Sequence, residues 1–323
     1  MTTLLNRLKS CQNRAERRQA AEHINSHLEE FELMLSQVFG DDSTSIEDKL
    51  FVLDYVDFVT HSAAVTVIEY ALKDDKPQVR IRGLQAAYRV RMESLNAEVK
   101  EILEDNEEVF QARKWAVHIL ATTDPNGYGR VLRKIARNSK EQVDLRKEAV
   151  FALTNIGDDE SLGALCALLG DSEKLIRVSS AWSLSRIGSP SSINCMLAAL
   201  EDEEEEVRDW AVRGLRDMDD SQALQGLADA MKLVQSGRQI RLIQLLAEKR
   251  SEIIQRAIAE MLLSTDSEVR RTAAWAMGVS PYPPAAGSLE QLLQDPDEQI
   301  REYARTALMM LGRIDPTDFG FKI

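Results

Sequence analysis

The stretch EDEEEEVRDWAVRGL, residues 201–215, joins an acidic run to a helical apolar pattern. Val207, Ala211 and Leu215 recur at intervals of four, a spacing that places them on one face of a helix. Glu203 to Glu206 fall in the turn before this helix and in its first turn, where the positive end of the helix dipole favours anions. The stretch therefore predicts a helix, and the beginning of that helix explains its acidic run.

The same pattern recurs along the chain, with an arginine every 29 to 33 residues. The residue before each arginine is apolar, and the residue three after it is usually small. The arginines of this pattern, called here the repeat arginines, are Arg80, Arg113, Arg146, Arg177, Arg208, Arg241, Arg270 and Arg301. Turn signals such as IGDDES and IGSPSS lie between these helices, and a second apolar helix follows each turn. A period of this length predicts stacked helix-turn-helix units.

The pattern V-R-x-x-A-x-x-A-L-x-x-I-G-D, clearest at 145–159 and 176–190, resembles the short HEAT repeats of the phycobilin-lyase-like type. The resemblance implies an all-α fold, a right-handed α-solenoid of stacked HEAT-like repeats held by nearest-neighbour contacts. We expect degenerate N-terminal capping repeats over 1–73, regular repeats over 74–312 and a C-terminal tail over 313–323. In that tail Phe319 and Phe321 are expected to cap the last apolar face or to dock a partner.

The resemblance also suggests that the repeat arginines form a ladder with loop carboxylates such as Asp171, Asp202 and Asp295. The repeat at Arg241 departs from the others, because Gln244 stands at the small position and Glu248 replaces an apolar residue. We expect a softer joint there.

Composition narrows the functional classes. The net charge of −13 repels phosphate backbones at long range, so a general nucleic-acid binder is not expected. Cys11, Cys166 and Cys195 lie far apart and suggest neither a disulfide framework nor a zinc ribbon. The N-terminus has no export-signal core, and no stretch approaches the ~18 apolar residues of a membrane span. These features predict a cytoplasmic protein.

By resemblance, the arginine-bearing helix of each pair lines the concave surface of the solenoid, with exposed positions one, two, five and nine residues after the arginine. These positions hold all four tryptophans of the chain. The candidate partner-binding residues among them are Arg82, Arg89, Lys114, Trp115, Lys147, Phe151, Trp182, Arg186, Trp210, Arg213, Arg250, Arg271, Trp275 and Tyr303.

Basic residues outnumber acidic ones at these positions, against the sign of the whole chain. Tryptophan and arginine are also the residues most enriched at binding hot spots. We therefore expect a non-enzymatic scaffold or adaptor that binds an acidic or mixed-charge protein segment. The structural alternative is that the rings pack between neighbouring helices and stiffen them, with arginines stacked on the rings.

Three enzymatic alternatives stay open. His23 and His27 have the spacing of two metal ligands on one helix face, with Glu22 or Glu30 to complete a site. A bilin lyase or isomerase would use Trp182, Trp210, Arg186 and Arg213 around a tetrapyrrole. A HEAT-like DNA glycosylase would pair Trp210 with Asp217. We expect no metal and no cofactor, and the sequence gives no oligomeric state.

Overall fold

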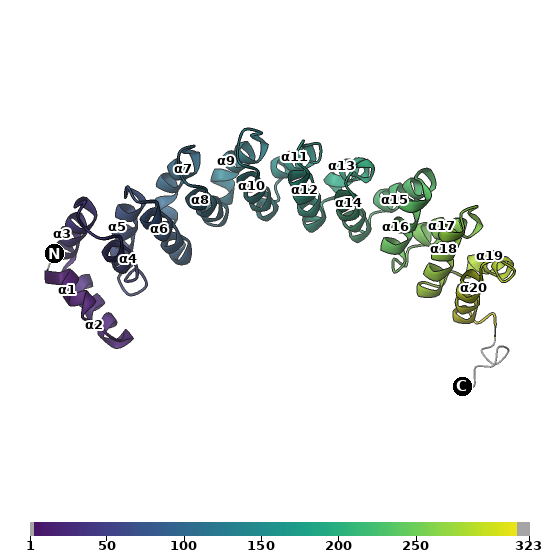
Figure 1. Ribbon diagram of the computed structural model, residues 1–323, viewed down its shortest axis with the longest axis horizontal. Helices are drawn as coiled ribbons and strands as arrows, with labels where there is room; N and C mark the ends of the chain where they lie inside the picture. The colour runs from purple at the N-terminus through teal and green to yellow at the C-terminus, as the bar shows by residue number, and fades with distance from the viewer. Residues whose placement is uncertain (1–2, 315–323) are drawn as a thin grey trace. The chain divides into compact units, whose positions relative to one another are not determined.

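The computed structural model describes residues 3–314, and every regular element in that range is a helix. The chain divides between Ser161 and Leu162 into two units, each with its own internal contacts. Within each unit the helices alternate between two layers, as Figure 1 shows. This confirms the expected all-α solenoid.

The helices up to the division and across it follow in chain order. They are α1 (Thr3–Lys9), α2 (Arg14–Ser26), α3 (Leu28–Gly40), α4 (Ile46–Leu53), α5 (His61–Leu72), α6 (Pro77–Val90), η1 (Glu93–Leu95), α7 (Asn96–Glu104), α8 (Phe110–Thr123), α9 (Pro125–Arg137), α10 (Val143–Ile156) and α11 (Asp159–Leu168).

The rest of the second unit continues the same alternation. Its elements are α12 (Lys174–Ile187), η2 (Pro190–Ser192), α13 (Ile193–Ala198), η3 (Ala199–Glu201), α14 (Glu205–Asp217), α15 (Ser221–Leu233), α16 (Ser236–Leu246), α17 (Glu252–Glu260), η4 (Met261–Leu263), α18 (Ser267–Val279), η5 (Pro283–Ala285), α19 (Ala286–Leu292) and α20 (Glu298–Met310).

Short polar residues fix where these helices begin and end. Asp266 and Asp297 cap α18 and α20, because each carboxylate accepts from two backbone N–H groups of the first helical turn. Gly157 and Gly188 end α10 and α12 with φ values of 63° and 64°, in the left-handed region that glycine enters without steric cost. The turn signals of the sequence thus lie at real helix ends.

The buried face of each repeat follows the predicted spacing. In α14, Val207, Ala211, Val212 and Leu215 are each at most 2% exposed. The small residues let α14 pack closely on α12, and a Cβ added at Gly214 would lie 2.9 Å from the Cα of Ser185. We call the helices that carry this pattern the arginine layer, which comprises α4, α6, α8 and α10 in the first unit and α12, α14, α16, α18 and α20 in the second.

The arginine ladder is present. Arg177 Nε donates to Asp202 Oδ2 at 2.9 Å, and Arg270 Nε donates to Asp295 Oδ2 at 2.8 Å. In both pairs the arginine begins one helix of the arginine layer, and the carboxylate precedes the next one. Lys49 takes the same place in α4, and its Nζ lies 2.7 Å from Asp74 Oδ2. The ladder therefore joins consecutive repeats.

The expected register at α16 is wrong by two residues. The repeat arginine is the fourth residue of α12, α14, α18 and α20, whereas the fourth residue of α16 is Gln239. Buried Leu242, Ile243 and Leu246 then take the positions three, four and seven after it. Gln244 is exposed and is not at the small position, so the stated reason for a softer joint disappears. The joint itself stays a prediction.

The expectation about the cysteines is also corrected. Cys166 of α11 and Cys195 of α13 form a disulfide, with their Cα atoms 5.6 Å apart. Their separation of 29 residues is one repeat, so they occupy matching places on consecutive helices of the other layer. Linear distance concealed this pairing, because stacking returns the chain to the same place every repeat.

The boundaries expected for the capping repeats and the regular repeats stay predictions. Phe319 and Phe321 lie outside the described residues, and so does most of the expected tail. Among residues 3–314, no helix has both the length and the apolar character needed to cross a membrane.

Candidate partner-binding face

In the first unit, the basic residues chosen from the sequence each face a carboxylate. Arg82 Nη2 lies 2.7 Å from Asp54 Oδ1, and Arg89 Nε lies 2.9 Å from Asp57 Oδ1. These four side chains are all about two-fifths exposed. Arg82 and Arg89 therefore sit on an exposed edge whose charges largely cancel.

Lys114 shares a carboxylate with a histidine. Its Nζ lies 2.6 Å from Glu148 Oε1, and His118 Nε2 lies 3.4 Å from Glu148 Oε2. Burial lowers the pKa of His118 below its ordinary value, and the nearby Lys114 charge adds to this, although Glu148 opposes both. The group therefore carries a neutral imidazole against a buried carboxylate at neutral pH.

Aromatic rings connect α6 and α8 in the same region. The ring of Trp115 lies 5.5 Å from that of Tyr88 and 6.0 Å from that of His118, measured between centroids. Lys147 pairs with Asp144 at 3.4 Å, and Phe151 is half-buried on α10. In this unit the rings pack on side chains of their own layer, which fits the stiffening alternative.

In the second unit, two tryptophans and two arginines lie on the adjacent helices α12 and α14. The guanidinium carbon of Arg213 lies 5.1 Å from the ring centroid of Trp210, a cation–π distance. Trp182 and Arg186 lie on α12, which packs along α14. Arg186 is exposed, and neither arginine lies within ion-pair distance of a carboxylate in the part of the chain that the structure describes.

A second group lies on α16, α18 and α20. Arg271, Trp275 and Tyr303 line one cavity of about 340 Å³ together with Gln244 and Thr272. Trp275 and Tyr303 are each 37% exposed, which is unusual for large rings that have no partner to cover them. Arg271 Nη2 lies 2.8 Å from Asp297 Oδ2 and Arg271 Nη1 lies 3.0 Å from Glu268 Oε2, so its charge is neutralised.

Sequence reasoning missed Gln244 and misplaced Arg250. Counted from Gln239, Gln244 is the fifth residue, the position that Trp182 and Trp275 hold in their repeats. Arg250 lies beyond the end of α16, in the connection to α17. The spacing of Leu242, Ile243 and Leu246 could have revealed the shift, because it repeats the buried spacing of α14.

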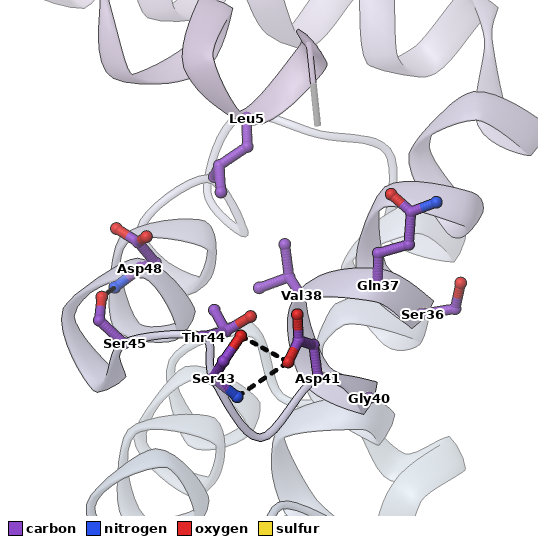
Figure 2. A pocket seen from close by; sticks show the side chains of 10 residues that line it. All are labelled: Leu5, Ser36, Gln37, Val38, Gly40, Asp41, Ser43, Thr44, Ser45 and Asp48. Carbon is purple, nitrogen blue, oxygen red and sulfur yellow. Dashed lines mark hydrogen bonds between the residues drawn. The ribbon is translucent and has the colours of Figure 1, made fainter. Parts of the chain in front are cut away.

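The largest cavity involves none of the expected residues. It measures about 560 Å³ and lies between α1, the end of α3 and the beginning of α4 (Figure 2). Asp41 accepts hydrogen bonds there from the backbone N–H and the hydroxyl of Ser43, at 2.8 Å and 2.7 Å. Those bonds lower the pKa of Asp41, and Asp48 pairs with Lys9. The polar groups thus shape a turn.

The histidine pair of α2 does not assemble a ligand set. The rings of His23 and His27 stack with centroids 4.3 Å apart, and His23 Nε2 lies 3.5 Å from Glu30 Oε2. Residues 3–314 contain no group of three histidine, cysteine or acidic side chains placed to hold a metal ion. The carboxylate of Asp217, which the glycosylase alternative requires, lies 2.7 Å from Arg216 Nε.

A two-layered stack of helix pairs joined by a ladder of ion pairs defines an α-solenoid of the repeat-protein class. The model of HEAT repeats matches residues 129–216 and 235–309, which together make up half of the chain. The chain therefore belongs to the HEAT-repeat family. No curated protein matches it.

Solved structures support the same fold. Yeast importin-beta (Kap95p) gives a TM-score of 0.53 at 13% identity, over 97% of this chain and 51% of its own. Kap95p bound to RanGDP gives 0.55 at 13% identity, over 96% and 50%. A mutant of Kap121p gives 0.61 at 12% identity, over 97% and 40%. The chain spans about half of these proteins or less, and identities this low show the fold alone.

Proposed function

We propose that this chain is a non-enzymatic scaffold that binds a protein segment on the arginine layer of its second unit. The observation that carries the proposal is the group Trp182, Arg186, Trp210 and Arg213 on α12 and α14. Its two guanidiniums are not neutralised by carboxylates of the described residues, and its two rings offer a large contact area. Such groups concentrate binding energy at few positions.

The charge of the partner follows from which bases are neutralised. Arg186 and Arg213 favour a carboxylate on the segment, whereas Arg271 already faces Glu268 and Asp297. The cavity beside Trp275 and Tyr303 suits an apolar or amide side chain of the segment instead. A mixed-charge segment with an acidic part over α12 and α14 therefore fits better than a uniformly acidic one. The structures of Kap95p with RanGDP and with Nup1 show that this fold can present protein-binding surfaces.

The test begins with affinity capture and mapping of the bound segment by cross-linking, followed by titration of that segment as a synthetic peptide. Trp210→Ala is expected to weaken peptide binding by about 2 kcal/mol or more, roughly thirtyfold in Kd. Arg213→Glu should reduce the association rate chiefly at low salt. The matched control is Glu206→Gln, an exposed residue of the same helix, which should bind like the original.

Circular dichroism of each variant separates lost binding from lost folding. If Glu206→Gln weakens binding as much as Trp210→Ala does, the segment docks elsewhere and the proposal is wrong. For the bilin alternative, a new absorbance band after mixing with a bilin would favour pigment chemistry, and Trp182→Ala should then abolish it.

The cellular location stays a prediction. Disulfides persist mainly in oxidising compartments, and Cys166–Cys195 therefore weighs against the cytoplasm expected from composition. Fractionation of cells that produce the protein would decide.

A further inference from the structure

The ladder of the second unit has one open position, at Arg208. In the ladder a cation near the start of one helix binds the aspartate 25 residues later, three residues before the next helix of the layer begins. Lys49–Asp74, Arg177–Asp202 and Arg270–Asp295 all follow this rule. The residue 25 after Arg208 is Leu233, three before α16 begins, and it is 85% exposed.

Arg208 is nevertheless held in the ladder orientation. Its Nη1 donates to the carbonyl of Asp202 at 2.6 Å, as Arg270 Nη1 donates to the carbonyl of Ser264 at 2.9 Å. The other donors, Nε and Nη2, hold the aspartate in Arg270. In Arg208 these two donors bind no residue that the structure describes, and neither is a buried orphan atom.

A cavity of about 220 Å³ lies beside Arg208, where the ladder aspartate is missing. Its apolar lining comes from η3, α14, α15 and α16 and includes Val212, Val234 and Leu242. Gly237, at the start of α16, also lines it, and no atom lies within 4 Å of where a Cβ would be. The space therefore offers an anchored guanidinium with an apolar wall next to it.

The charges around the cavity favour one more anion. Arg241 pairs with Asp209 and with Glu205, whose Oε1 lies 3.4 Å from Arg241 Nε, so these three groups satisfy one another. Arg238 Nη1 lies 3.2 Å from Glu201 Oε2, at a pair that is largely exposed. Arg208 is the remaining cation of the lining, and a single carboxylate would neutralise it.

We propose that this cavity binds a carboxylate of a partner peptide, with an apolar side chain next to it, and so completes the ladder at Arg208 from outside. A guanidinium binds a carboxylate through two parallel N–H donors, the geometry that the cis aspartates use at Arg177 and Arg270. The site shares no residue with the face of Trp182, Arg186, Trp210 and Arg213, and it stands or falls separately from the proposed scaffold function.

The direct test uses protein labelled with ¹⁵N-arginine and the Nε–Hε signal that disappears in Arg208→Lys. N-acetyl-leucine presents a terminal carboxylate and N-acetyl-aspartyl-leucinamide an internal one, while N-acetyl-leucinamide has neither. The Arg208 signal is expected to shift with at least one carboxylate probe and to stay in place with the amide. The stronger probe tells whether the natural ligand is a chain end or an acidic side chain.

The second test closes the site in cis. Leu233→Asp places a carboxylate at the ladder position, and because Leu233 is exposed the change leaves the core intact. It should shift the Arg208 signal without any probe and weaken probe binding by about tenfold or more. Leu233→Asn is the matched control and should bind the probes like the original protein.

Three results would overturn the proposal. They are an Arg208 signal that ignores both carboxylate probes, a shift with inorganic phosphate at least as large as with the carboxylates, and undiminished probe binding in Leu233→Asp.

Discussion

Arg270 Nε donates to Asp295 Oδ2 at 2.8 Å, and this bond joins the start of α18 to the connection that precedes α20. Burial alone would raise the pKa of Asp295, but the hydrogen bond and charge of Arg270 outweigh it and hold the pKa below its ordinary value. The relationship ties consecutive repeats through one side chain from each.

Asp295→Asn should therefore destabilise the protein. The Asp295 side chain is only 5% exposed, and loss of a charge-assisted hydrogen bond there is expected to cost about 1–3 kcal/mol. Urea unfolding at pH 7 measures the cost. Because the native pKa is lowered, this contribution is present at neutral pH and is lost as the pH falls below about 4. Glu290→Gln, an exposed carboxylate of α19, is the control and should change little.

Two alanines test the close packing of the arginine layer. Ala149 and Ala211 are fully buried, so leucine at either position should cost about 1–3 kcal/mol by overpacking. Ala97→Leu, at an exposed position of α7, should be nearly neutral. Thermal unfolding that is unchanged in both buried variants would contradict the assigned face.

Two glycines should respond to alanine in opposite directions. A Cβ at Gly214 would meet the Cα of Ser185 at 2.9 Å, so Gly214→Ala should destabilise. Gly163 lies in α11 with no atom within 4 Å of a Cβ, so Gly163→Ala should stabilise by about 0.5–1 kcal/mol through helix propensity. Chemical denaturation of the pair checks the prediction, and equal shifts in one direction would refute it.

His118 should make stability depend on pH. Its native pKa is lowered, so between that value and the ordinary value of about 6.5 the unfolded chain binds the proton more tightly. The contribution is full above pH ~6.5 and declines as the pH falls below it. Urea midpoints at pH 7.5, 6.5 and 5.5 should fall less steeply in His118→Gln. Parallel pH profiles in the two proteins would show that another group is responsible.

The joint between α14 and α16 should exchange its amide protons faster than the repeats beside it. The reason is the open ladder position at Arg208, together with Gln239 in place of an arginine, whereas Gln244 has no part in it. Hydrogen exchange across 221–246 measures this. Protection equal to that of α12 and α18 would count against a soft joint, and would indicate that the Arg241–Asp209 pair compensates.

The local sequence determined the helices, their buried faces and most of the ladder. Apolar residues at fixed spacing and capping residues at turns act within a few residues of one another, so Val207, Ala211 and Leu215 could be assigned to one face directly. The same reasoning placed all four tryptophans on the arginine layer, because position within a repeat is a local property.

Only the tertiary structure decided what those side chains meet. Arg82 and Arg271 read as free bases in the sequence, but each faces a carboxylate from a neighbouring helix. Cys166 and Cys195 became partners because stacking brings residues 29 apart together. The shift at α16 and the open position at Arg208 emerged in the same way, since a ladder is a relation between repeats. Periodicity fixes which face a residue lies on, whereas the partner across that face depends on how neighbouring repeats stack.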